Sequence, residues 1–157
     1  MRLTSTSFQP GSAIPSKFTC EGENMSPELS WADAPAGTKT FALVLHDPDA
    51  PRAGGFTHWV LYNIPANHTQ LPENIRPGDN LPDGGMQGMN DAGKQGYMGP
   101  CPPSGSHRYF VRIYALDAEL ALAPGASHGE LAAAMRGHEL AHAELMGKYR
   151  KKSAKAA

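Results

Sequence analysis

Apolar runs at four places along the chain predict β-strands. Residues Phe41–Leu45 (F-A-L-V-L) contain no polar side chain, which predicts a central strand covered on both faces. Thr57–Ile64 and Tyr109–Leu116 are rich in aromatic and β-branched residues, the types favoured in strands. Ala141–Arg150 alternates with a period near two and is predicted as a strand, although its A-H-A-E-L-M segment could also extend a helix.

Weaker patterns near the N-terminus predict shorter strands. Arg2–Phe8 is expected to form the first strand, and a second strand is expected around Phe18 after a proline-rich turn. Leu29–Trp31 is predicted to be a short strand that follows a polar loop. The chain is therefore predicted to be mainly β.

One segment carries clear helix signals. Ser127, with Glu130 three residues later, forms a capping box, and Leu131–Met135 consists of good helix formers. Gly137 suits the C-terminal end of that helix. One convincing helix is expected in a chain that is otherwise rich in strands and turns.

The strand from Tyr109 follows a stiff loop, Gly99–Gly105, whose prolines have no N–H to donate. Because strand side chains alternate between faces, His107 and Tyr109 should share one face with Val111 and Ile113. The loop thus places a histidine and a tyrosine side by side at the start of a core strand, which predicts a site.

Two aspartates follow the predicted central strand directly, in the segment D-P-D-A-P. Prolines extend the backbone around Asp47 and Asp49, and the Ala50–Pro51 bond is a candidate for a cis peptide. The alternative is an ordinary solvated turn held by aspartate side chains. The sequence alone leaves both interpretations open.

His58 lies at the start of the next strand, where parity places it on the same face as Val60 and Tyr62. A histidine at such a position is usually a satisfied polar residue at the edge of a core. After that strand, Pro65–Met98 is a long stretch without sustained periodicity. Long irregular stretches are often functional, so it is expected to cross the surface and form one wall of a pocket.

The size and charge of the chain narrow its possible functions. Its 157 residues fit one domain, predicted at 1–150, and a formal charge of −1 leaves no electrostatic footprint for nucleic acid. The basic residues at the end are expected to form a disordered tail, 151–157. No segment resembles a membrane span, and Met1–Thr19 lacks the apolar core of a secretory signal, so a soluble cytoplasmic protein is expected.

The two cysteines, Cys20 and Cys101, are too few for a four-ligand zinc site and do not form a C-x-x-C pair. In a reducing cytosol two free thiols are favoured over a disulfide. Ser104 and Ser106 lie near a histidine in sequence, but their side chains should point away from it, which argues against a serine hydrolase. Nothing in the spacing demands a metal, and no cofactor is expected.

The remaining polar residues suit an anion. The N–H groups of imidazole and the O–H group of phenol can donate to a phosphate or carboxylate ligand. The aspartate carboxylates can orient the imidazoles or bind a cationic part of the same ligand. We therefore expect a small anionic or zwitterionic ligand. An enzyme is less expected. Two alternatives remain open: a hydrolase or lyase that uses His58 or His107 as general acid or base, and a homodimeric inhibitor of a partner protein. The candidate residues are Asp47, Asp49, His58, His107 and Tyr109.

Four separated motifs resemble the phosphatidylethanolamine-binding protein family, in its bacterial and archaeal Raf kinase inhibitor-like branch. They are N-M-S-P-E-L-S-W at 24–31, D-P-D-A-P at 47–51, H-W-V-L-Y-N at 58–63 and G-P-C-P-P-S-G-S-H-R-Y at 99–109. The resemblance covers essentially the whole chain. It implies a sandwich of two antiparallel sheets with a few short peripheral helices, and a pocket for phosphate or a phosphoethanolamine head group.

The resemblance also implies site residues, carried over by motif: Asp47, Asp49, Pro51 after a cis bond, His58, Gly99, Pro103, His107 and Tyr109. It implies that Cys20 and Cys101 lie near the pocket, which makes their pairing as plausible as two free thiols. The chain ends differently from eukaryotic members, whose extra C-terminal helix borders the pocket. Kinase regulation through that surface is therefore not expected to transfer to this chain.

Overall fold

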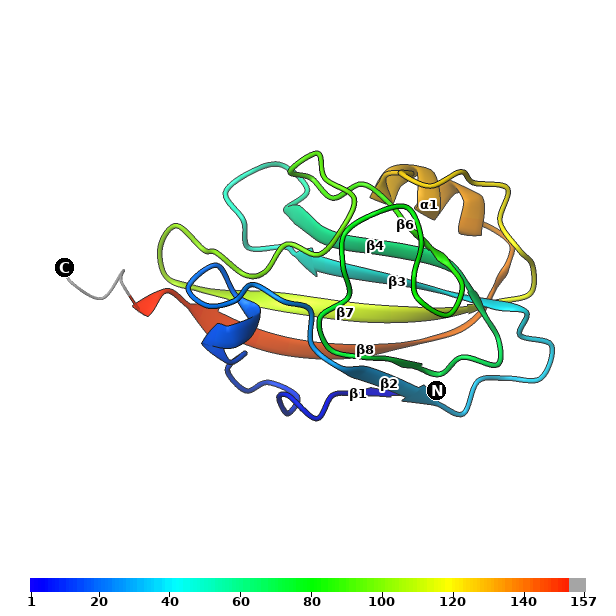
Figure 1. The fold of residues 1–157 in the computed structure, drawn as a ribbon, viewed down its shortest axis with the longest axis horizontal. Helices are drawn as coiled ribbons and strands as arrows, with labels where there is room; N and C mark the ends of the chain where they lie inside the picture. The colour runs from blue at the N-terminus through cyan, green and yellow to red at the C-terminus, as the bar shows by residue number, and fades with distance from the viewer. Residues whose placement is uncertain (153–157) are drawn as a thin grey trace.

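The computed structural model describes residues 1–152, in which five antiparallel strands form the larger of two sheets (Figure 1). Their order across the sheet is β6 (Met86–Gln87), β4 (Phe56–Pro65), β3 (Thr40–Asp47), β7 (Ser106–Leu116) and β8 (Glu139–Arg150). The smaller antiparallel sheet has the order β1 (Arg2–Thr4), β2 (Leu29–Ala32) and β5 (Gln70–Leu71). The predicted mainly β fold with two antiparallel sheets is confirmed.

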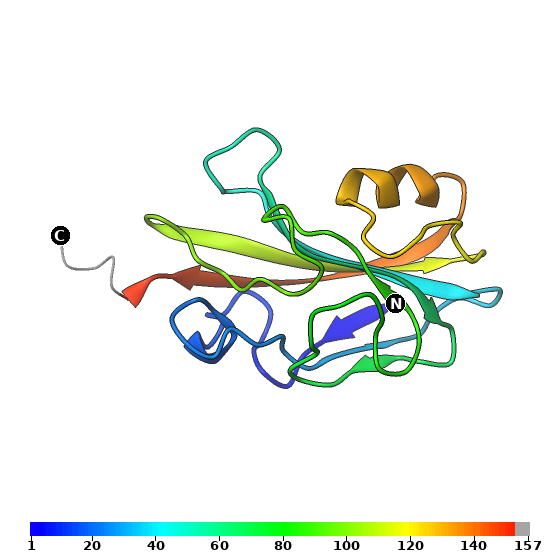
Figure 2. The same cartoon turned by 45° about the horizontal axis from the view of Figure 1, so that its top comes forward.

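The larger sheet is covered on both faces (Figure 2). The α-helix α1 (His128–Met135) lies on one face, while the smaller sheet and the N-terminal segment lie on the other. A single 3-10 turn, η1 (Ser16–Phe18), lies among the N-terminal loops of the described chain. The expected peripheral helices are therefore one α-helix and one short turn.

Strand β3 is central and buried on both faces, as its continuous apolar run predicted. Phe41, Leu43 and Leu45 contribute to the core between the two sheets. Ala42 and Val44 contribute to the smaller core beneath α1. Because side chains alternate along a strand, a run without polar residues can supply both cores at once.

The predicted capping box of α1 is present. The Ser127 side chain accepts a hydrogen bond from the Glu130 N–H, and the Glu130 carboxylate accepts one from the Ser127 N–H. Leu131 and Met135 are buried against the sheet. Gly137, just past the helix, has a φ of 80°, a left-handed conformation that glycine adopts without strain.

Two N-terminal predictions were wrong in detail. Phe18 lies in a 3-10 turn rather than a strand, because the N–H of Phe18 donates to the Pro15 carbonyl in an i→i+3 bond. The first strand ends at Thr4 rather than at Phe8. Beyond Thr4 the chain bonds to a side chain instead of a neighbouring strand, since the Thr6 N–H donates to the Glu28 carboxylate.

The C-terminal strand β8 is confirmed and begins at Glu139. Of the predicted disordered tail, only Lys151 and Lys152 are described, and the Lys152 N–H donates to the Glu21 carboxylate at 2.8 Å. Residues 153–157 of that prediction lie outside the described residues. Within residues 1–152 no helix has the length and apolar character needed to cross a membrane.

Replacing Ser127 with alanine should destabilise the domain by about 1 kcal/mol, because the Glu130 N–H loses its capping acceptor. Urea unfolding of the oxidised protein measures the effect. Ser104→Ala is the matched control, since Ser104 is exposed and makes no hydrogen bond within the described chain. Equal stability of the two variants would show that the capping box contributes nothing.

Candidate ligand-binding site

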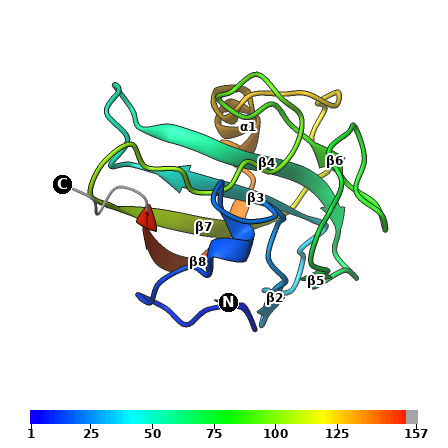
Figure 3. The ribbon, with the colours of Figure 1, turned by 60° about the vertical axis from the view of Figure 1, so that its left-hand side comes forward.

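A cavity of about 180 Å³ is lined by residues at the end of β3, the start of β4 and β7, and the loops that follow β3 and precede β7. Figure 3 shows how the strands and loops at this end of the larger sheet are arranged. The predicted site residues that line it are Asp47, Pro51, His58, Pro103, His107 and Tyr109. The lining also includes Ala50, Arg52, Phe56, Met98, Cys101 and Pro102. Segments far apart in the sequence therefore form one pocket.

A buried hydrogen bond joins Asp47 at the end of β3 to His107 at the start of β7. The Nδ1–H of His107 donates to Asp47 Oδ2 at 2.6 Å, and the two residues are 7% and 2% exposed. Because a carboxylate only accepts, this contact fixes the proton of the imidazole on Nδ1. Nε2 of His107 is then the ring nitrogen available for a ligand.

His58 is fixed from the opposite side of the pocket. Its Nδ1–H donates to the Met98 carbonyl at 2.7 Å, and the residue is 4% exposed. Burial lowers the pKa of His58, because the charged imidazolium loses its water. The neutral ring then carries a lone pair on Nε2, so at neutral pH His58 offers a hydrogen-bond acceptor.

The side of the sheet to which His58 points was predicted wrongly. Val60 and Tyr62 pack beneath α1, whereas the His58 ring packs edge-on against Tyr109, with 5.3 Å between ring centroids. A β-bulge explains the difference. Leu45 pairs with Trp59 but the next residue, His46, pairs with Thr57, so His58 is the extra residue, and strand parity is interrupted there.

Tyr109 brings a polar group into the pocket that has no partner. The residue is 1% exposed, and its hydroxyl has no hydrogen-bond partner within residues 1–152. The hydroxyl lies near the Asp47 carboxylate and the Cys101 backbone without completing a well-formed bond to either. Burial raises the pKa of Tyr109, so the phenol keeps its proton and is a donor.

Asp49 and Gly99, both predicted as ligand residues, do not line the cavity. Asp49 forms a two-pronged ion pair with the Arg108 guanidinium, with both N···O distances 2.9 Å, and these hydrogen bonds lower the pKa of Asp49 to about 2. A Cβ added to the buried Gly99 would lie 2.3 Å from the Phe18 carbonyl oxygen. The structure thus places both residues in the support of the pocket walls.

The expected cis bond between Ala50 and Pro51 is absent, since no peptide bond in residues 1–152 is cis. One hydrogen bond to a side chain and one between backbone groups hold the turn here. The Asp49 N–H donates to Asp47 Oδ1 at 2.8 Å, and the Arg52 N–H donates to the Ala50 carbonyl at 2.7 Å. These bonds form the turn with trans peptides, which an X–Pro bond favours by about 0.5–1 kcal/mol.

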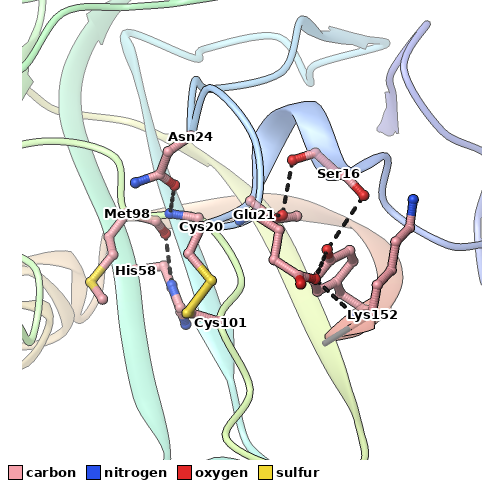
Figure 4. The surroundings of a disulfide bond; sticks show 11 residues. Ser16, Cys20, Glu21, Asn24, His58, Met98, Cys101 and Lys152 are labelled. Atoms are coloured by element: carbon pink, nitrogen blue, oxygen red, sulfur yellow. Dashed lines mark hydrogen bonds between the residues drawn. A yellow bond between two sulfur atoms is a disulfide. The ribbon is translucent and has the colours of Figure 1, made fainter. Parts of the chain in front are cut away.

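A disulfide joins Cys20 to Cys101, with 5.5 Å between their Cα atoms (Figure 4). The sequence left pairing and free thiols open, and the structure has the pair. The disulfide connects the turn after η1 to the loop before β7 across a sequence separation of 81 residues. Cys101 also lines the pocket, so the bond is part of its wall.

Sequence reasoning missed Arg52, Phe56 and Met98 as lining residues. The Arg52 guanidinium lies over the Phe56 ring at 5.4 Å from its centroid, and the Phe56 ring lies 4.9 Å from that of His58. Arg52 directly follows D-P-D-A-P, and this adjacency was a usable signal. Met98 belongs to the long stretch that was expected to form a wall. No group of three or more His, Cys, Asp or Glu in the described chain is arranged to hold a metal.

Comparisons with known proteins agree with this fold. The family model "Phosphatidylethanolamine-binding protein" matches residues 4–150. A UPF0098 protein of Methanothermobacter thermautotrophicus is 52% identical, covering 96% of this chain and 99% of the relative. A second UPF0098 protein, from Aquifex aeolicus, is 46% identical and covers 96% of this chain and 89% of the relative.

Two solved structures are also similar. A phosphatidylethanolamine-binding protein homologue from Chlamydia trachomatis has a TM-score of 0.87 and 41% identity, covering 96% of this chain and 97% of that one. E. coli YbcL, described as a member of the mammalian family, has a TM-score of 0.89 and 37% identity, covering 96% and 98%. The chain therefore belongs to the phosphatidylethanolamine-binding protein family, in its bacterial and archaeal branch.

Proposed function

We propose that the pocket binds small anionic or zwitterionic groups, such as phosphate or a phosphoethanolamine head group. The observation that carries this proposal is the buried Tyr109 hydroxyl without a partner, beside the Asp47–His107 pair in the same cavity. A buried donor without an acceptor costs roughly 1–3 kcal/mol. A ligand oxygen that accepts from Tyr109 would remove this cost.

The charges in the pocket suggest which residue attracts an anion. The Asp47 carboxylate would offset a positive charge on His107, and burial keeps His58 neutral. Among the described residues that line the pocket, Arg52 alone carries a basic side chain of the lysine or arginine type. No carboxylate lies within ion-pair distance of it in the described part of the chain. We infer that Arg52 supplies the net positive charge for the ligand.

The histidines have different parts in this proposal. The Tyr109 hydroxyl would donate to an anionic oxygen, and Nε2 of His107 would do the same when the ring carries a proton on both nitrogens. Nε2 of the neutral His58 would accept from a donor on the ligand, such as an ammonium group or a protonated phosphate oxygen. A ligand carrying both an anionic acceptor and a donor fits these three groups better than a bare dianion does.

The size and walls of the cavity limit the rest of the ligand. At about 180 Å³ it is smaller than the roughly 300–1,000 Å³ of typical small-molecule pockets, which favours a head group over a whole lipid. Pro51, Phe56, Met98 and Pro103 form an apolar wall. A few carbon atoms attached to the charged group would pack against it.

Replacing Arg52 with glutamine should weaken the binding of inorganic phosphate or phosphoethanolamine about 5- to 20-fold, because the rim loses its unpaired charge. Isothermal titration calorimetry of the oxidised protein measures this. The matched control is Arg136→Gln, which removes the same charge from the exposed end of α1. Equal affinities of the two variants would remove Arg52 from the site, and no binding by the unaltered protein would refute the function.

The neutral state of His58 predicts how stability depends on pH. Its folded-state pKa is lowered, so the unfolded chain binds the proton more tightly. The contribution of His58 to the free energy of unfolding is therefore fully present above its unfolded pKa of about 6.5. It is lost as the pH falls below that value, by up to about 1.4 kcal/mol per pH unit. His128, whose pKa burial also lowers, acts in the same direction.

Urea unfolding between about pH 5 and pH 8 tests this. His58→Gln should flatten the loss of stability at acid pH relative to the unaltered protein. His142→Gln, on the exposed side of β8, should leave it unchanged. An unchanged slope in His58→Gln would mean that His58 is not held neutral.

A further inference from the structure

We propose that Cys20 is a modification site for small thiols, and that opening of the Cys20–Cys101 disulfide there loosens the pocket wall. The modification and the loosening follow from the structure around the disulfide. The expected change in ligand affinity rests, in addition, on the proposed function.

The two cysteines differ in their access to solvent. Cys20 is exposed, whereas Cys101 is half-buried and lines the cavity. A thiolate must reach one sulfur along the S–S axis, so access decides which sulfur is attacked. An incoming thiol therefore meets Sγ of Cys20 first.

The reaction balances with a low-molecular-weight thiol such as glutathione as the reductant. Its thiolate attacks Sγ of Cys20 and forms a mixed disulfide, while the S–S bond breaks and the electron pair leaves with Sγ of Cys101. Cys101 then holds a thiolate in the pocket wall, which takes up a proton from water. A second thiol can attack the mixed disulfide, releasing Cys20 and an oxidised thiol dimer.

Hydrogen bonds hold residues 97–100, which precede the pocket wall, but not the wall residues 101–105. The Tyr97 hydroxyl donates to the Phe18 carbonyl at 2.6 Å, and the Gly99 N–H donates to Asn24 Oδ1 at 2.9 Å. The Cys20 N–H donates to the Pro100 carbonyl at 3.2 Å. Up to residue 100, the chain would therefore stay attached without the disulfide.

Residues 101–105 have no such support. They make no well-formed hydrogen bond within residues 1–152, although the Cys101 backbone lies beside the Tyr109 hydroxyl. Pro102 and Pro103 have no N–H to donate, and Gly105 has a φ of 68° at the turn into β7. Apart from the packing of the buried Pro102, the disulfide is thus the main constraint on this part of the wall.

Opening the disulfide should therefore change the mobility of the pocket wall alone. Pro102 and Pro103 would become mobile while the β3–β7 pairing stays intact, since its hydrogen bonds do not involve the loop. A ligand would then have to order the wall as it binds, and that ordering costs affinity. Redox state would in this way control how tightly the pocket holds its ligand.

The first experiment maps the modification. The oxidised, folded protein is incubated with reduced glutathione, free thiols are blocked, and peptides are analysed by mass spectrometry. The glutathione adduct is expected on Cys20, while protein unfolded in urea should react at both cysteines. An adduct on Cys101 in the folded protein, or no exchange under these conditions, would overturn the proposal.

The second experiment measures the consequence. NMR backbone order parameters of Cys101, Ser104 and Gly105 are compared in the oxidised protein, the reduced protein and the Cys20→Ser/Cys101→Ser variant. The order parameters should fall on reduction and in the variant, while those of β3 and of the distant turn at 91–93 should not change. Unchanged order in the wall, or unfolding of the whole domain, would refute local opening.

Calorimetry with phosphoethanolamine on the same samples tests the link to binding. Affinity should be about 5- to 50-fold weaker in the reduced protein and in the double variant than in the oxidised protein. Equal affinities would refute redox control of the pocket. If no sample binds phosphoethanolamine or phosphate, the proposed function fails, while the mapped adduct and the order parameters still decide the modification and the loosening.

Discussion

The buried hydrogen bond between the Asp47 carboxylate and the His107 imidazole is the contact on which the site depends. It joins the end of β3 to the start of β7, and these strands are paired along their length from Thr40 to His46. Removing the imidazole would leave the buried Asp47 carboxylate without its donor, and an unsatisfied buried polar group costs about 1–3 kcal/mol, or more when it is charged. The same contact that joins the ends of β3 and β7 therefore also fixes the imidazole that lines the pocket.

At the pocket end of the larger sheet, one face contacts α1 and the other lines the pocket. On the side of α1, the Thr57 hydroxyl bonds to Nδ1 of both His46 and His128, at 2.9 and 2.8 Å, and attaches the helix to the sheet. The residues that follow along the chain, Asp47 and His58, face the pocket. The bulge at His58 makes this possible, since regular alternation would have placed its ring beneath α1.

Elements that depend on residues close in the sequence were predicted well, whereas contacts between distant segments were not. The apolar run Phe41–Leu45 gave the central strand, and alternation after Tyr109 gave the buried face of β7. A bulge arises from pairing with another strand, so the orientation of His58 could not be read from its own segment. The disulfide and the position of Arg52 likewise depend on loops that meet only in the folded chain.

We propose that the pocket at the end of β3 and β7 binds an anionic group through its imidazoles and its phenol. Imidazole ¹⁵N NMR of the oxidised protein, titrated with inorganic phosphate, tests it most directly. Saturable changes are expected at Nε2 of His58 and His107 and at the Tyr109 ring, with none at the exposed His142. Unchanged Nε2 signals from His58 and His107 throughout the titration would contradict it.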